Sequence, residues 1–144
     1  MNIIICGAGK VGFSISKQLS AQGHSITVID QSSEDVKKIN DTQDVKAIVG
    51  RASLPSVLEN AGAENADMVI AVTRNDETNM IVCQLASSLF NISKKIARIR
   101  TKDFLEGKWG KLYNKSNIPI DVIISPEKEV AKSLFRRLEA PGAL

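Results

Sequence analysis

The chain has 144 residues, enough for one globular domain with a sizeable core. Apolar residues make up 43% of it, charged residues 24%, and the formal net charge is +3, values typical of soluble globular proteins. This balance does not favour binding to nucleic acid, and no apolar stretch reaches the roughly 18 residues of a transmembrane helix. Cys6 and Cys83 lack metal-ligand spacing and are predicted to be buried thiols in a reducing compartment.

The first element is a run of three isoleucines at 3–5, which predicts a strand buried on both faces. Directly after it, Gly7, Gly9 and Gly12 form the pattern G-x-G-x-x-G. In that pattern the first glycine permits a sharp turn, the second lets a pyrophosphate approach the backbone, and the third lets helix and strand pack closely. The helix predicted to begin at Lys10 would point its free N–H groups at the phosphate.

Short glycine patterns also recur by chance, so a strand, turn and helix without a ligand is the alternative on this motif alone. A second predicted strand, 25–29, is followed by Asp30. Dinucleotide-binding folds place an acidic residue at this spacing, where it accepts hydrogen bonds from the adenosine ribose hydroxyls. No arginine follows Asp30 directly to neutralise a 2′-phosphate. The stretch therefore predicts NAD(H) or another adenosine nucleotide in preference to NADP(H).

Helices and strands alternate along the rest of the chain. Helices are predicted at 10–21, 33–40, 54–61, 76–90, 102–113 and 127–138, and further strands at 45–49, 67–72, 96–100 and 120–124. This alternation predicts an α/β fold of the Rossmann type, a doubly wound parallel six-stranded sheet with strand order 3-2-1-4-5-6. The last helix has an apolar stripe and follows an edge strand, which predicts self-association or packing back onto its own sheet.

In this strand order the first and fourth strands adjoin, and ligands bind beyond the carboxyl ends of the strands there. Lys10 would reach a phosphate or remain solvated. Thr73 and Arg74 would hold a ribose and a phosphate, or serve only as a helix cap. Arg98 and Arg100 would share one face of the fifth strand and need a partner, either the ligand or a carboxylate of the chain. The candidate binding residues are Gly7, Ala8, Gly9, Lys10, Val11, Asp30, Arg51, Ala52, Thr73, Arg74 and Arg98.

No catalytic set is apparent in the sequence. It contains no Ser/His/Asp arrangement, no Cys–His pair and no zinc-ligand spacing, and its single histidine, His24, falls in a predicted surface turn. The sequence therefore favours a nucleotide-binding module over a complete enzyme. The competing interpretations are the dinucleotide-binding half of an NAD-dependent dehydrogenase and a structural domain that binds no ligand.

Several longer motifs carry a resemblance that covers nearly the whole chain. The more specific of them are Asp76-Glu77-Thr78-Asn79-Met80, Ala97-Arg98-Ile99-Arg100, Ile124-Ser125-Pro126-Glu127 and Pro141-Gly142-Ala143. With the glycine turn and Asp30, these motifs resemble the N-terminal RCK/KTN nucleotide-binding domain of Trk-type potassium-uptake regulatory subunits. Arg51 departs from the family pattern, in which a small, acidic or amide residue is expected beside the adenine.

The resemblance implies a regulatory function. Such a domain binds NAD(H) or ATP/ADP without turnover, and the bound nucleotide biases the gate of a membrane potassium channel or transporter. It is cytoplasmic, assembles as a homodimer or tetramer, and meets the inner face of the plasma membrane only through its partner. The resemblance also implies that residues 1–140 form the Rossmann domain and that 141–144 begin a linker to a further domain.

Overall fold

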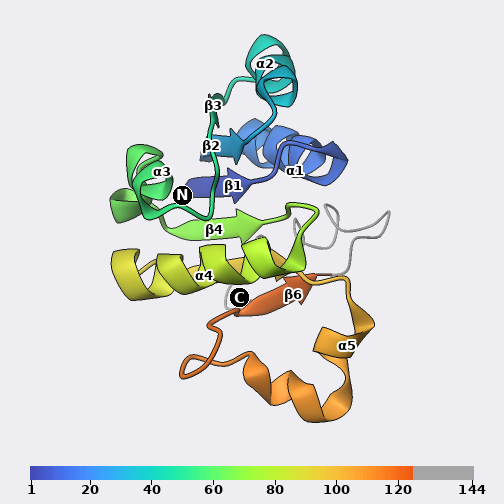
Figure 1. Ribbon diagram of the computed structural model, residues 1–144. Helices are drawn as coiled ribbons and strands as arrows, with labels where there is room; N and C mark the ends of the chain where they lie inside the picture. Colours follow the sequence, from blue (N-terminus) through green and yellow to red (C-terminus); the bar gives the residue numbers. More distant parts are fainter. Residues whose placement is uncertain (125–144) are drawn as a thin grey trace.

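The computed structural model describes residues 1–124, so the predicted helix at 127–138 and the predicted linker at 141–144 lie outside the described residues. Six parallel strands form one sheet with the order β3-β2-β1-β4-β5-β6 (Figure 1), which confirms the predicted fold and strand order. The strands are β1 (Asn2–Cys6), β2 (Ser25–Asp30), β3 (Lys46–Val49), β4 (Met68–Ala71), β5 (Lys94–Arg98) and β6 (Val122–Ile124). The helices are α1 (Lys10–Ala21), α2 (Ser33–Thr42), α3 (Pro55–Asn60), α4 (Asp76–Phe90) and α5 (Lys102–Leu105), with the 3₁₀ segments η1 (Ala63–Asn65) and η2 (Gly107–Leu112).

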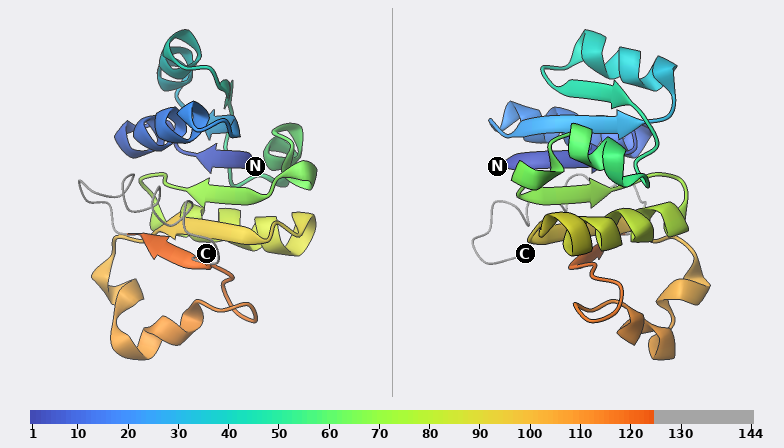
Figure 2. Two further views of the ribbon diagram at one scale, coloured as in Figure 1. Left: turned by 180° about the vertical axis from the view of Figure 1, so that it is seen from behind. Right: turned by 60° about the vertical axis from the view of Figure 1, so that its left-hand side comes forward.

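The sheet has an apolar core on each face. Figures 1 and 2 show α3 and α4 on one face and α1 and α2 on the other. Because successive side chains of a strand point to opposite faces, Ile3 and Ile5 join the core with α1 and α2, whereas Ile4 and Cys6 join the core with α3 and α4. This two-sided burial explains the continuous apolar run of β1.

The β5 region differs from the sequence prediction. β5 ends at Arg98 instead of residue 100, because the N–H groups of Arg100 and Thr101 donate to the Asp76 carboxylate at 3.0 and 2.9 Å. Arg100 therefore lies in the following loop and is exposed. The helix predicted at 102–113 is also wrong, since only the four residues of α5 are α-helical before the chain continues as η2.

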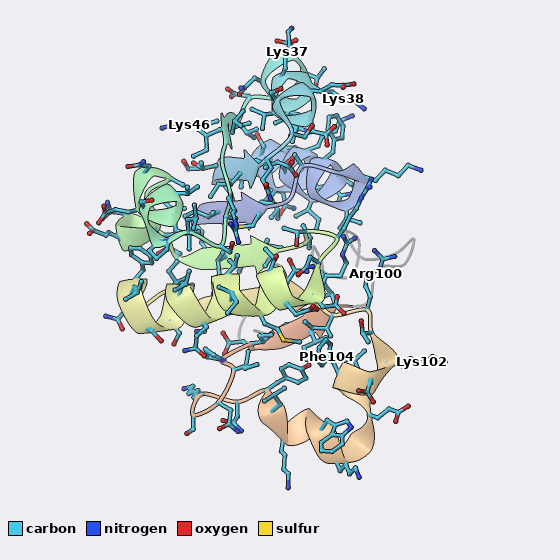
Figure 3. All side chains as sticks on the ribbon, in the orientation of Figure 1. Lys37, Lys38, Lys46, Arg100, Lys102 and Phe104 are labelled. Atoms are coloured by element: carbon cyan, nitrogen blue, oxygen red, sulfur yellow. The ribbon has the colours of Figure 1, made fainter. Side chains whose placement is uncertain are left out.

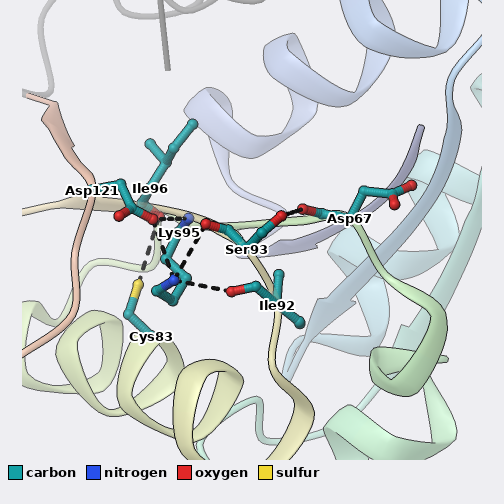
Figure 4. A network of polar contacts seen from close by, with 7 residues as sticks. All are labelled: Asp67, Cys83, Ile92, Ser93, Lys95, Ile96 and Asp121. Atoms are coloured by element: carbon teal, nitrogen blue, oxygen red, sulfur yellow. Dashed lines mark hydrogen bonds and ion pairs between the residues drawn. The ribbon is translucent and has the colours of Figure 1, made fainter. Parts of the chain in front are cut away.

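The amino end of β5 contains a buried charge, Lys95 (Figure 4). Its Nζ lies 3.3 Å from the Asp121 carboxylate and donates to the Ile92 carbonyl at 2.9 Å. Nearby, burial raises the pKa of Cys83 to about 12, the positive charge of Lys95 opposing and the negative charge of Asp121 adding to that rise. Cys6 is buried as well, so the predicted burial of both thiols is confirmed.

At one residue, Ala47, the outer edge of the sheet at β3 is covered by a side chain. Asn40 of α2 donates from Nδ2 to the Ala47 carbonyl and accepts from the Ala47 N–H, both at 3.1 Å. The amide of Asn40 thus takes the place of one hydrogen-bonded residue of a neighbouring strand.

Candidate functional site

The loops after β1 to β5 surround a cleft of about 500 Å³ at the carboxyl ends of the strands, called here the strand-end cleft. Its lining residues are Gly7, Gly9, Lys10, Val11, Ile29, Asp30, Gln31, Ser32, Asp35, Gly50, Ala52, Val72, Thr73, Arg74, Asn75, Thr78, Arg98 and Arg100. Figure 3 shows Arg100 at the end of the molecule toward which the strands point, away from Lys37, Lys38 and Lys46 on α2 and β3. The cleft lies where the sequence predicts a ligand.

The three glycines of the turn have different surroundings. Gly7 has a φ of +119°, and a Cβ added there would lie 2.8 Å from the Val72 carbonyl oxygen. A Cβ added at Gly12 would lie 2.7 Å from the Gly7 carbonyl carbon and overlap its oxygen. At Gly9 an added Cβ would meet no atom of the described residues within 4 Å. Packing of the fold therefore accounts for Gly7 and Gly12, whereas Gly9 faces open space in the cleft.

The amino end of α1 adjoins this open space. Gly9 is the N-cap of α1 and has no side chain to bond the first amides. The first N–H groups of any α-helix lack acceptors within the helix and carry its positive dipole end. Lys10 is exposed at this end of the helix and lines the cleft. The arrangement is suited to an anion such as a phosphate group.

Asp30 connects the glycine turn to the start of α2. Its Oδ2 accepts from the Ala8 N–H at 2.7 Å, and its Oδ1 accepts from the Ser32 N–H at 2.8 Å. Each carboxylate oxygen keeps capacity for a further donor. Asp35 lines the same side of the cleft, and no cationic side chain among the described residues does so from β2 or β3. This end of the cleft is acidic.

The opposite side of the cleft is basic, with Arg74 and Arg100 exposed and Arg98 only 6% exposed. One terminal nitrogen of Arg98, Nη2, donates to the Thr73 carbonyl at 2.7 Å, while its buried Nε has no hydrogen-bond partner among the described residues. Burial lowers the pKa of Arg98, and the charge of Arg100 lowers it further, while Asp76 opposes this. An anion in the cleft would relieve this repulsion and supply an acceptor.

The described residues form neither a metal-binding cluster nor a membrane-spanning helix. Within residues 1–124 no three His, Cys, Asp or Glu side chains lie close enough together to hold a metal ion. No helix in the same range is both long and apolar enough to cross a membrane.

Comparison with known proteins assigns the family. The family model of the TrkA-N domain matches residues 3–126. The chain belongs to the TrkA-N domain family. Two relatives, both called Trk system potassium uptake protein TrkA, come from Azorhizobium caulinodans and Haemophilus influenzae. They are 45% and 43% identical over the whole of this TrkA-N chain, which spans 31% of the length of each.

Solved structures share the fold of this TrkA-N domain at low sequence identity. The TrkA-N domain of the Escherichia coli inner membrane protein ybaL has a TM-score of 0.74 at 21% identity, with 96% of each chain covered. The GsuK channel bound to NAD has a TM-score of 0.69 at 18% identity, over 85% of this chain and 21% of the channel chain. ChuY, an anaerobillin reductase from E. coli O157:H7, has a TM-score of 0.68 at 15% identity, over 98% and 92%. The fold therefore occurs in both channels and enzymes.

Most of the predicted site residues of the TrkA-N domain line the cleft, with two exceptions. Ala8 is buried behind the turn and contributes its N–H to Asp30. Arg51 is exposed, is not among the lining residues, and donates from Nε to Ser53 Oγ at 3.2 Å. The prediction omitted Asp35 and Gly50, which also line the cleft. A usable signal existed, since Gly50 directly follows a predicted strand and Asp35 lies in the first turn of the helix after Asp30.

Proposed function

We propose that this TrkA-N domain binds NAD(H) or ATP/ADP in the strand-end cleft and acts as a regulatory domain of a potassium uptake system. The observation that carries the proposal is the polarity of the cleft. Asp30 and Asp35, after β2, line one end, and Arg74, Arg98 and Arg100, after β4 and at β5, line the other, with Lys10 after β1 between them. An adenosine with a charged phosphate tail has the matching arrangement of hydroxyl donors and anionic groups.

The residues present suit such a ligand in three places. The Asp30 carboxylate would accept from the ribose hydroxyls, as an acidic residue at this point does in dinucleotide-binding folds. The open side of Gly9 and the first amides of α1 would hold the phosphates. Thr73, Arg74 and Arg98 would meet the distal part of the ligand. A 2′-phosphate would lie among Asp30 and its acidic surroundings, so NADP(H) is disfavoured.

The regulatory part of the proposal rests on the comparisons. The relatives are called potassium uptake proteins, and a solved channel with this fold has bound NAD. We infer a cytoplasmic domain that meets a membrane potassium channel or transporter subunit at the inner face of the membrane and assembles as a homodimer or tetramer. Residues 1–140 would form the domain and 141–144 would begin the linker to a further one. The nucleotide would bias the gate without being consumed.

A thermal-shift panel of NAD, NADH, NADPH, ATP and ADP tests nucleotide binding by this chain. A ligand at 100 times its dissociation constant adds about 2.7 kcal/mol of stability. For a domain of this size that corresponds to a rise in melting temperature of about 5–10 °C. The proposal fails if none of the five raises the melting temperature, or if NADPH raises it as much as NADH does.

Two substitutions separate a regulatory ligand from a substrate. Asp30→Ala should weaken all adenosine ligands alike, because they share the ribose, whereas Arg98→Ala should change the ratio between ligands. Potassium uptake in cells that carry Arg98→Ala in the longer protein should then change as well. The cleft lining among the described residues contains no His, Cys or Tyr. Sustained consumption of NADH by the purified protein would instead support the dinucleotide-binding half of a dehydrogenase.

A further inference from the structure

Asn79 of α4 lies behind the basic side of the cleft and is completely buried. Its Nδ2 donates to the Thr73 carbonyl at 3.1 Å and to the Arg98 carbonyl at 2.8 Å. Its Oδ1 accepts from the Thr73 N–H at 3.0 Å and from Thr73 Oγ1 at 2.6 Å. All four hydrogen bonds available to an asparagine side chain are therefore made, and all go to two ligand-facing positions.

The two positions joined by Asn79 belong to different strands. Thr73 follows β4 and Arg98 ends β5, and beyond these points the two strands no longer pair with each other. The Thr73 carbonyl accepts from both Asn79 Nδ2 and Arg98 Nη2. Asn79 thus fixes the carbonyl that orients the Arg98 guanidinium, and Nε of that guanidinium is buried without a hydrogen-bond partner in residues 1–124.

A second residue of α4 reinforces this arrangement. Asp76 lies one turn before Asn79 on the same face of the helix, and it is 5% exposed. Its carboxylate accepts from the N–H groups of Arg100 and Thr101. The start of α4 therefore holds the loops after β4 and β5, which carry Arg74 and Arg100 and are called here the basic loops. Asn79 binds Thr73 in the first of them, and Asp76 binds Arg100 and Thr101 in the second.

We propose that Asn79 is a positioning residue of the strand-end cleft, setting the spacing between Thr73 and Arg98 and so the affinity for the distal part of the nucleotide. This inference rests on the proposed function. The adenosine side does not depend on Asn79, since Asp30 is held by the N–H groups of Ala8 and Ser32. Loss of Asn79 should therefore weaken long ligands and spare short ones.

Titration calorimetry of AMP, NADH and ATP with Asn79→Ala tests the proposal. AMP has one phosphate and probes mainly the Asp30 and Gly9 side, whereas NADH and ATP extend to the basic loops. We expect the affinity for NADH and ATP to fall about tenfold, the equivalent of roughly one net hydrogen bond, and that for AMP to fall less than twofold. General destabilisation would lower all three equally. If the alanine variant does not fold, Asn79→Ser, which keeps a small polar group, should show the same change in ratio.

Cys83→Ala is the matched control. Cys83 is buried one turn further along α4, and its Sγ lies 3.9 Å from the Ile96 carbonyl oxygen, away from both basic loops. The Cys83→Ala variant should have a lower melting temperature but an unchanged ratio of AMP to NADH affinity. In the double variant Asn79→Ala with Arg98→Ala, the loss of NADH affinity should be smaller than the product of the two single losses, because part of the effect of Asn79 passes through the Arg98 guanidinium.

Two results would overturn the inference in different ways. Equal weakening of AMP, NADH and ATP by Asn79→Ala, or an equal change in ratio in Cys83→Ala, would reduce Asn79 to a structural residue while leaving the proposed function intact. Failure of the unsubstituted protein to bind any of the three would overturn the proposed function, and this inference with it.

Discussion

Gly12→Ala should destabilise the protein through a direct clash between α1 and the turn. The added Cβ would lie 2.7 Å from the Gly7 carbonyl carbon, about 1 Å short of the roughly 3.5–4.0 Å of ordinary contact. Because the Cβ is fixed to the backbone of α1 and also overlaps the Gly7 carbonyl oxygen, no side-chain rotation can relieve the clash, and we place the cost at no less than about 3 kcal/mol, the upper end for overpacking. For a domain of this size the melting temperature should fall by roughly 6–12 °C, measured by circular dichroism.

Gly9→Ala is the contrasting substitution in the same turn. Gly9 has φ −72°, which alanine adopts freely, and an added Cβ meets no atom of residues 1–124 within 4 Å. Alanine is a poorer N-cap than glycine, so stability should fall by less than about 1 kcal/mol. The methyl group would occupy the space into which phosphate must enter, and NADH affinity should drop at least about tenfold. The reasoning is refuted if Gly12→Ala melts like the unsubstituted protein, or if Gly9→Ala binds NADH equally well.

Three further predictions follow from polar and ionisable groups away from the glycine turn. Asp121→Ala should cost about 2–3 kcal/mol in urea unfolding because it leaves the Lys95 charge buried without its carboxylate, whereas Lys95→Met should cost less, because it removes the buried charge and leaves Asp121 partly exposed and still accepting from the N–H of residue 95. Burial acts to raise the pKa of Asp76, but hydrogen bonds from the Thr101 side chain and from the N–H groups of Arg100 and Thr101, with the positive charge of Arg100, outweigh it and hold that pKa below its usual value. The Asp76 carboxylate therefore contributes to stability above about pH 4, and this contribution is lost as the pH falls through the lowered pKa. In Asp76→Asn the free energy of unfolding should fall less steeply as the pH is lowered. Burial also raises the pKa of the Cys6 and Cys83 thiols, so neither should react with a thiol reagent until the protein is denatured.

The sequence predicts the strand order and the position of the cleft because those features depend on local signals. The isoleucine run of β1 is β-branched and leads into a glycine turn, a combination typical of a strand covered on both faces. Gly7 and Gly12 occupy positions where a Cβ would clash with backbone, so their spacing reports the turn geometry directly. Asp30 ends β2 beside that turn and bonds to it.

The features that the sequence does not predict depend on contacts between distant segments. The end of β5 is set by Asp76, which draws the Arg100 amide away from the sheet. From the sequence, Lys95 is expected at the surface, and its burial is explained only by its pairing with Asp121 in the fold. Arg51 follows β3 next to the cleft in sequence, but its guanidinium bonds to Ser53 and does not line the cleft. A pattern of residue types cannot state which way such a long side chain turns.

The amide of Asn40 against β3 has a consequence for the chain while it is being synthesised. The segment that contains β1, β2 and β3 emerges from the ribosome before β4 and can pair its three strands first. Its outer edge at β3 would already be covered at Ala47, because residue 40 precedes Ala47 in the chain. The other edge of this half-made sheet is that of β1, where β4 pairs next. The contact at Ala47 would thus interrupt the edge that no later strand of the sheet covers, which limits misassembly between neighbouring nascent chains.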